Sequence, residues 1–200
     1  MKCPYTRKNL GQIMTLITLV EIGVKGIADV PLEISKGIFQ HHERFDGSGY
    51  PTGAVSGQIS EFARAIGLAD QFCNLLTGWP DGAPLPAHLA IPNISKNCDR
   101  LFGRDLMKHL LQVVGVYPVG TMAKLSNDEL AVVTSVNVDD FLRPEVAIVF
   151  DRERVFVPKP NRRLDLAGEL ERADNLAIRA TSDLKDFGID HVDWITQPPG

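Results

Sequence analysis

Two adjacent histidines and two aspartates are the residues of this chain whose types and spacing suggest metal chemistry. His41 and His42 stand side by side, Asp46 follows shortly after them, and Asp70 lies further along the chain. Imidazole and carboxylate groups are the usual ligands of borderline divalent ions such as iron, manganese and zinc. Neighbouring residues of a helix point about 100° apart, so a single ion can bind both imidazoles only if the helix unwinds there. Two ions, each bound by one histidine, would suit the hydrolysis of a phosphate ester.

The spacing alone leaves a simpler interpretation open. Asp70 is expected on the flank of an apolar helix stripe, where a carboxylate without a partner would be costly. A nearby arginine or a helix N-terminus would satisfy it as well as a metal ion, and buried polar groups usually have such ordinary partners. The isolated histidines His88, His109 and His191 are each interpreted as ordinary surface or core residues.

The residues around the histidine pair form one uninterrupted signature. Residues 41–51 are HHERFDGSGYP, and this run resembles the signature of the HD-GYP family of bacterial cyclic di-GMP phosphodiesterases. Residues 64–70, RAIGLAD, are similar to the family's following helix, in which an arginine precedes a metal-binding aspartate by six residues. The resemblance covers residues 19–158 and includes a β module that follows the catalytic core in many members.

The resemblance implies a role for each of these residues. His41, His42 and Asp70 would bind a divalent metal ion, with iron or manganese favoured. The signature loop would lie beside the substrate pocket and would also contact partner proteins, including diguanylate cyclase domains. Its glycines would permit positive φ angles and close backbone approach, although without the flanking residues the loop would be interpreted as a simple tight turn. The loop and substrate-side residues are Asp46, Gly47, Gly49, Tyr50, Pro51 and Arg64.

Arg64 has two interpretations that the sequence leaves open. It could contact a phosphate of the substrate, as the resemblance suggests. It could equally pair with Glu61 or Asp70, which lie close to it along the predicted helix.

Several parts of the family's site have no counterpart in this chain. The family also uses a His-Asp pair on an earlier helix, a lysine soon after that pair, and a further histidine before the signature. No histidine precedes His41, and Leu19 occupies the position where the further histidine is expected. The family's basic cluster after the aspartate helix is replaced by TGWPDG at residues 77–82, which has no basic residue. We therefore assign no catalytic residue and expect a weak or incomplete metal site.

Two functional hypotheses follow from this pattern. The first is a metal-dependent phosphodiesterase, a hydrolase of bacterial second-messenger signalling, that is truncated or degenerate and inactive alone. The second is a non-catalytic signalling module that binds a protein partner or a nucleotide such as cyclic di-GMP through the GYP loop. A His-Asp segment in the DNA immediately upstream would favour a truncated gene, and its absence would favour a degenerate module.

A mainly helical part must position these residues. Up to about residue 112 the sequence predicts helices, and the resemblance implies that they form a partial HD-domain helical bundle. Its helices are expected from Pro31 to His42, from Ser60 as N-cap to Gly78, and over residues 105–114, with the proline-rich stretch 79–92 as a loop. The second helix carries a stripe of apolar residues at helical spacing that predicts its buried face. The stripe residues are Phe62, Ile66, Ala69, Cys73 and Leu76.

A small antiparallel β unit is expected next, because the hydrophobic period changes near Tyr117. Residues 121–125, 130–136 and 145–150 are rich in valine and isoleucine and are separated by turn-forming residues, which is typical of strands. We expect the helical domain at residues 1–112, the β module at 113–158, and a C-terminal tail at 159–200 with one helix near 167–180.

The composition narrows the functional class. Of the 200 residues, 44% are hydrophobic and 23% are charged, as in an ordinary soluble globular protein. A net charge of -4 gives no basis for binding nucleic acid. The apolar run at residues 13–20 is too short to span a bilayer. Three cysteines without metal-type spacing fit the reducing cytoplasm better than a disulfide framework.

Overall fold

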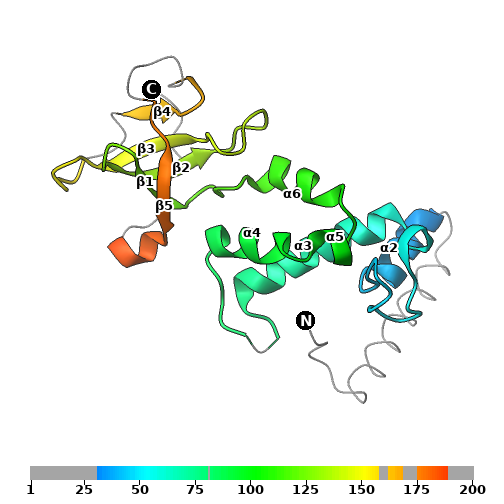
Figure 1. The fold of residues 1–200 in the computed structure, drawn as a ribbon. Helices are drawn as coiled ribbons and strands as arrows, with labels where there is room; N and C mark the ends of the chain where they lie inside the picture. The colour runs from blue at the N-terminus through cyan, green and yellow to red at the C-terminus, as the bar shows by residue number, and fades with distance from the viewer. Residues whose placement is uncertain (1–30, 81, 158–161, 169–174, 189–200) are drawn as a thin grey trace. The chain divides into compact units, whose positions relative to one another are not determined.

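A computed structural model describes residues 31–80, 82–157, 162–168 and 175–188 of the chain. The chain divides into two compact units, Met1–Leu85 with Pro92–Met107 and Pro86–Ile91 with Lys108–Gly200. Helices and the loops that connect them make up the described part of the first unit, and the second contains an antiparallel sheet (Figure 1). The predicted fold class, mainly helical with a C-terminal β unit, is confirmed.

The helices begin and end at signals in the sequence. Helix α2 (Leu32–Gln40) follows Pro31 directly. Helix α3 (Glu61–Thr77) is capped by Ser60, whose side chain accepts a hydrogen bond from the backbone N of Ala63 at 3.1 Å. It ends at Gly78, which has a φ of 73°. The other helical elements are η1 (Ser56–Gln58), α4 (Ala87–Ser95), α5 (Cys98–Leu101) and α6 (Leu106–Val114).

The stretch 79–92, predicted as a proline-rich loop, includes the first six residues of helix α4. The backbone N–H groups of Leu89 and Ala90 donate to the carbonyl of Pro86, at 2.9 and 3.1 Å, and so start the helix. Pro92 lies inside α4. Pro86 directly precedes the helix, where a missing N–H has little effect, whereas Pro92 is the sixth of the nine helical residues and did not prevent this short helix from forming. None of the described helices has the length and apolar character that a membrane span requires.

The buried face of α3 is not the one that the apolar stripe predicts. Phe62 is 64% exposed and Ile66 45% exposed, whereas Ala63 and Gly67 are buried. The cause is the close approach of α3 to the end of α2, because a Cβ atom on Gly67 would lie 2.3 Å from the carbonyl oxygen of His41. Only small residues fit at this crossing, so the larger side chains of Phe62 and Ile66 lie at its edge, where they remain partly exposed beside Gly37 of α2. Of the other stripe residues, Ala69 and Cys73 are exposed and Leu76 is half-buried.

We expect Ser60→Ala to lower the free energy of unfolding of the helical unit by about 1 kcal/mol, the usual cost of losing an N-cap. The substitution removes the acceptor for the backbone N–H of Ala63. Urea unfolding followed by circular dichroism at the helix band measures the change. Ser60→Thr keeps a hydroxyl acceptor and should retain most of the stability. Equal losses of stability in the two variants would show that the hydrogen bond to the Ser60 hydroxyl is not the cause.

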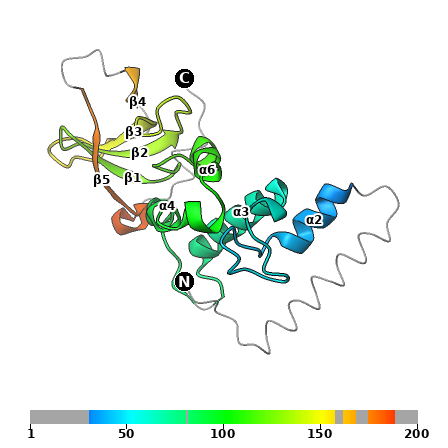
Figure 2. The same ribbon diagram turned by 45° about the vertical axis from the view of Figure 1, so that its right-hand side comes forward.

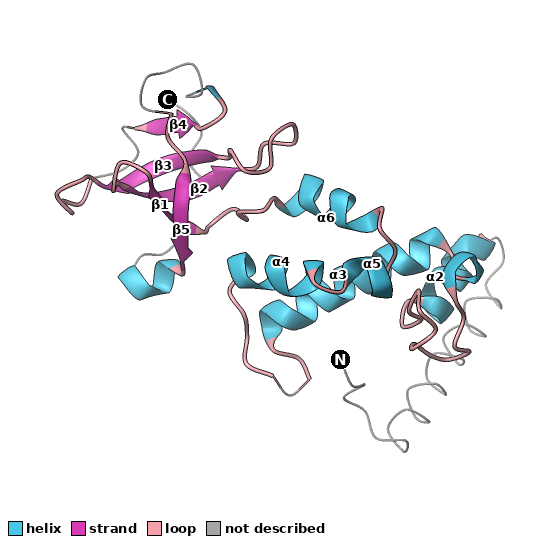
Figure 3. Ribbon diagram, in the orientation of Figure 1, coloured by secondary structure: helices cyan, strands magenta, loops and turns pink. Residues whose placement is uncertain are grey.

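Five antiparallel strands form the sheet of the second unit, in the order β4-β3-β2-β1-β5 (Figures 2 and 3). The three predicted strands are confirmed to within one residue at each end. They are β1 (Met122–Leu125), β2 (Leu130–Ser135) and β3 (Glu145–Phe150).

The C-terminal region, predicted as a tail with one helix, supplies the two outer strands β4 (Arg163–Asp165) and β5 (Ile178–Ser182). The predicted helix is therefore wrong at residues 178–180, which pair with β1. The unpaired backbone edge of β1 is a template for another strand, and this pairing outweighs the local helical pattern. Residues 169–174 of the predicted helix lie outside the described residues.

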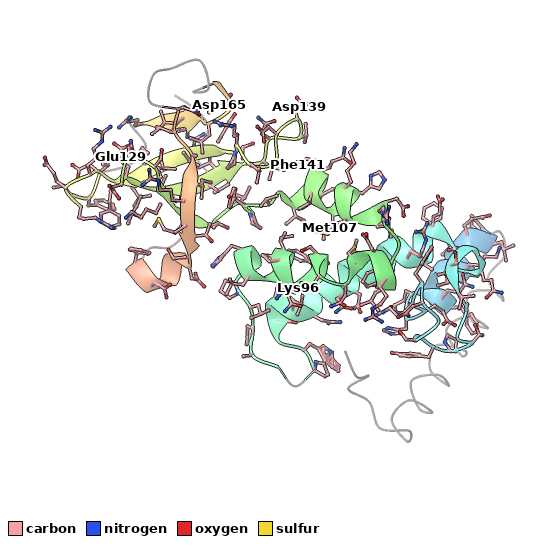
Figure 4. The ribbon with its side chains drawn as sticks, in the orientation of Figure 1. Lys96, Met107, Glu129, Asp139, Phe141 and Asp165 are labelled. Atoms are coloured by element: carbon pink, nitrogen blue, oxygen red, sulfur yellow. The ribbon has the colours of Figure 1, made fainter. Side chains whose placement is uncertain are left out.

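Both faces of the sheet are buried. Successive residues of a strand point to opposite faces, so Val132 and Val133 belong to different apolar clusters. One cluster includes Leu125 and Ile148, and the other includes Met122. Glu129, just before β2 (Figure 4), is also buried, and its Oε1 atom pairs with Nη1 of Arg162 at 2.6 Å. The β unit therefore has a core of its own.

Candidate metal-binding and signature-loop site

The histidine pair lies just beyond the end of a helix. Helix α2 ends at Gln40, and His41 and His42 occupy the turn that follows. Their ring centroids are 4.0 Å apart, with 39° between the ring planes. The separation expected for neighbours on a continuous helix therefore does not apply, and the two imidazoles lie side by side.

His41 is oriented by its own helix. Its Nδ1 atom lies 2.8 Å from the carbonyl oxygen of Ile38. A carbonyl oxygen can only accept a hydrogen bond, so we assign the proton to Nδ1, which leaves the lone pair on Nε2. A hydrogen bond from the other ring nitrogen commonly orients histidines that bind metals.

His42 is held neutral. Its partial burial, together with the nearby His41 and the positive charge of Arg44, lowers the pKa of His42 to about 4. A histidine must be deprotonated to bind a metal ion, and His42 meets this condition at neutral pH. The ring of Tyr50 stacks on its imidazole, with centroids 4.7 Å apart and 27° between the planes.

The signature loop folds back onto the backbone that follows the histidines. Gly47 has a φ of 78°, which favours glycine. A Cβ atom on Gly49 would lie 2.4 Å from the backbone N of Arg44 and 2.5 Å from the carbonyl oxygen of His42. The backbone N–H of Tyr50 donates to that same carbonyl at 3.3 Å. Positive φ and close approach, the two predicted reasons for glycine in this loop, are both present.

Glu43 is the acceptor around which the loop closes, although sequence analysis did not single it out. It is 2% exposed. One carboxylate oxygen accepts from the backbone N and the Oγ1 of Thr52, at 2.6 and 2.7 Å, and the other accepts from the backbone N of Ala54 at 3.1 Å. The available signal was its place inside the signature, directly after the histidine pair.

Arg64 joins the loop to a later segment of the chain. Its Nη1 atom donates to the carbonyl oxygen of Phe102 at 2.9 Å and to Oδ1 of Asp105 at 3.1 Å. Its guanidinium lies over the ring of Phe45, 5.5 Å from the centroid, and Glu61 is 3.9 Å away. The predicted pairing with Glu61 is thus present at the edge of ion-pair range. Contact between Arg64 and a phosphate stays a prediction.

Asp46 is engaged within the protein. Its Oδ1 atom accepts hydrogen bonds from the backbone N and the Oγ of Ser48, at 3.0 and 2.6 Å, and Oδ2 forms an ion pair with Arg100. Burial acts to raise the pKa of Asp46, but the bonds from Ser48 and the guanidinium of Arg100 hold it below its ordinary value. Arg100 was missed by sequence analysis because it lies 54 residues further along the chain.

Asp70 lies on α3, one helical turn beyond the contact between Gly67 and the His41 carbonyl. It is half-buried, and its Oδ2 atom accepts from Nδ2 of Asn74 at 3.0 Å. Among the described residues, no three His, Cys, Asp or Glu side chains form a group that could hold a metal ion. The imidazole and carboxylate groups suit a divalent ion, but within the described part of the chain too few of them lie together to form a metal site. The convergence of Asp70 with His41 and His42 stays a prediction.

Comparisons with known proteins agree with the signature. Residues 19–106 match a family model described as HD domain. A cyclic di-GMP phosphodiesterase of Pseudomonas aeruginosa is 33% identical over 134 residues, which cover 66% of this chain and 32% of that protein. The cyclic di-GMP phosphodiesterase PdeB of Borreliella burgdorferi is 18% identical over 144 residues, 72% of this chain and 38% of that protein.

A third relative matches a shorter part of the chain. The cyclic di-GMP phosphodiesterase response regulator RpfG of Xanthomonas campestris is 37% identical over 73 residues, 36% of this chain and 19% of that protein. The chain spans about a third of the length of the curated relatives that match most of it, 32% of one and 38% of the other. No solved structure matches it significantly.

Proposed function

The chain belongs to the HD-GYP family, and on this premise we propose that it is a protein of bacterial cyclic di-GMP signalling that does not hydrolyse the nucleotide on its own. One observation carries the proposal: a fully built signature loop stands beside a set of metal ligands that the described residues do not complete. The loop is closed by Glu43 and the two imidazoles lie side by side. No histidine precedes His41, so the chain lacks a His-Asp pair before its signature.

A divalent metal ion, iron or manganese, is the cofactor that these donors favour. His41 and His42 would each contribute one nitrogen, and Asp70 is the candidate for a carboxylate oxygen. An open metal site commonly has three protein ligands, and the described part of the chain does not bring three together. We therefore propose that the isolated chain binds the metal weakly.

Metal analysis of the purified chain tests this proposal. After loading with manganese or ferrous iron and dialysis against a chelator, we expect much less than one bound ion per chain, because too few ligands hold it. His42→Ala should remove the weak binding seen in a direct titration. His109→Ala, which changes an exposed histidine hydrogen-bonded to Gln112, should leave it unchanged. Stoichiometric metal that survives dialysis would show that the ligand set is complete.

The second candidate function is that of a binding module that acts through the signature loop. The loop owes its shape to the buried carboxylate of Glu43 and to the ion pair of Asp46 with Arg100, so no ion is needed to build it. Val55, at the end of the loop, is 44% exposed and available to a partner. The proposed partners are cyclic di-GMP or a protein such as a diguanylate cyclase domain, in the reducing cytoplasm that the cysteine content favours.

A binding measurement without metal separates the two candidates. Cyclic di-GMP and a diguanylate cyclase domain are each titrated into the chain in the presence of a chelator. Binding that persists, and that Tyr50→Ala weakens while Tyr117→Ala does not, would support the module. If neither partner binds in the presence of chelator, the binding-module hypothesis is rejected and the metal-dependent function is favoured.

A further inference from the structure

The most deeply buried acidic side chain of the described helical unit lies next to the histidine pair. Glu43 follows His42 directly, is 2% exposed, and receives three hydrogen bonds from residues nine to eleven positions further along the chain. Buried carboxylates need such donors, because an unpaired one would carry a large desolvation cost. Both carboxylate oxygens of Glu43 accept hydrogen bonds from loop residues, so this side chain stabilises the conformation of the loop.

These hydrogen bonds determine where the tip of the signature loop lies. Thr52 comes two residues after Tyr50, and it donates both its backbone N–H and its hydroxyl to Glu43. The backbone N–H of Tyr50 in turn reaches the carbonyl of His42. The chain on both sides of Tyr50 is thus tied to the two residues 42 and 43, and the ring of Tyr50 stacks on the imidazole of His42 at 4.7 Å.

The other anchor of the loop is weaker. Asp46 pairs with Arg100, whose side chain is 48% exposed. Ion pairs that are open to solvent contribute little, typically below about 1 kcal/mol. The buried acceptor Glu43 is therefore the group whose removal should release the loop from the histidines.

We propose that Glu43 is a positioning residue that holds the signature loop closed over His42, so that Tyr50 covers one face of the imidazole and sets the direction of its ring. The hydrogen bonds to Thr52 and Ala54 transmit this restraint, and the stack of Tyr50 on His42 is its result. The inference concerns the site of the proposed function, but its test uses neither metal nor nucleotide. Failure of the proposed function would therefore leave the result of the test intact.

The chemical shifts of the His42 ring protons report the stack directly, because a neighbouring aromatic ring displaces them. We would record two-dimensional NMR spectra of the full chain labelled at histidine, and assign His42 by its loss in His42→Ala. Tyr50→Leu gives the reference for a ring without its stacked partner. Glu43→Ala should move the His42 signals most of the way from the wild-type position to this reference. Glu33→Ala, which removes an exposed carboxylate on α2, should leave them in place.

Two milder variants keep the test decisive if Glu43→Ala does not fold. Thr52→Val removes only the hydroxyl donor, and Glu43→Gln replaces the acceptor of the Ala54 N–H by an amide, which can rotate to offer one oxygen. Each should move the His42 signals part of the way toward the Tyr50→Leu reference. A merely structural glutamate would lower stability and leave the His42 signals of the folded protein at the wild-type position. Unchanged signals in folded Glu43→Ala, or in both milder variants, would overturn the proposal.

Discussion

Purified chain incubated with cyclic di-GMP and manganese or ferrous iron should release no linear product above the rate measured with the metal alone. Two-metal sites assist phosphodiester hydrolysis by holding both the attacking and the leaving oxygens of an in-line displacement. Among the described residues no group of three possible metal ligands forms, and none of the residues before His41 in this sequence is a histidine. The segment after α3 also offers no basic side chain at residues 77–82 to stabilise charge on the phosphate.

The expected loss is large. Removal of a single electrostatic stabiliser commonly lowers the rate by about 10²- to 10³-fold. Losses of groups that act as one unit do not add, but an absence of several leaves little beyond the background rate. Product is followed by chromatography, and His42→Ala serves as the matched variant. Turnover by the lone chain that disappears in His42→Ala would contradict the prediction. Turnover only after addition of a second polypeptide with a His-Asp pair would show completion of the site in trans.

Gly49→Ala should lower the free energy of unfolding of the helical unit by about 3 kcal/mol, at the upper end of the usual cost of an added methyl group in a packed site. The new Cβ atom would lie within 2.5 Å of backbone atoms of His42, Glu43 and Arg44. Backbone atoms cannot rotate away as the end of a side chain can, so the loop itself must move. We expect the stack of Tyr50 on His42 to be lost with it.

A second glycine of the same region provides the control. Gly57 lies in η1, and a Cβ atom there would meet no atom within 4 Å. Gly57→Ala should therefore leave the stability unchanged or raise it slightly, because alanine restricts the unfolded chain. Chemical denaturation followed by tryptophan fluorescence and circular dichroism compares the two variants. Equal stabilities would show that the loop accepts a side chain at position 49 and does not pack as closely as described.

The sequence predicts this protein best where the physical cause is local. Ser60 caps α3 because its own hydroxyl reaches a backbone N–H three residues away, and Gly78 ends the helix because it adopts a positive φ. The strands β1, β2 and β3 follow from short alternating runs separated by turns. The signature of residues 41–51 identified the family, since its types and order stand in one continuous run.

Features that depend on partners far along the chain could not be predicted in the same way. The apolar stripe of α3 is largely exposed because Gly67, and not the stripe, contacts the backbone of His41, and the hydrophobic period contains no information about that crossing. β5 forms because β1 offers an open edge more than fifty residues earlier. The ion pair of Asp46 with Arg100 could not be predicted either, because the two residues lie far apart in the sequence.

The histidine pair combines both kinds of cause. The order of residues alone predicts that two imidazoles stand next to each other and that glycines follow them. The packing of the chain ends α2 before the pair, so that the rings lie 4.0 Å apart, and it buries Glu43 beneath the loop. The end of α2 and the burial of Glu43 both depend on how α3 and the signature loop pack against residues 41–43. The order of residue types along the chain does not specify that packing.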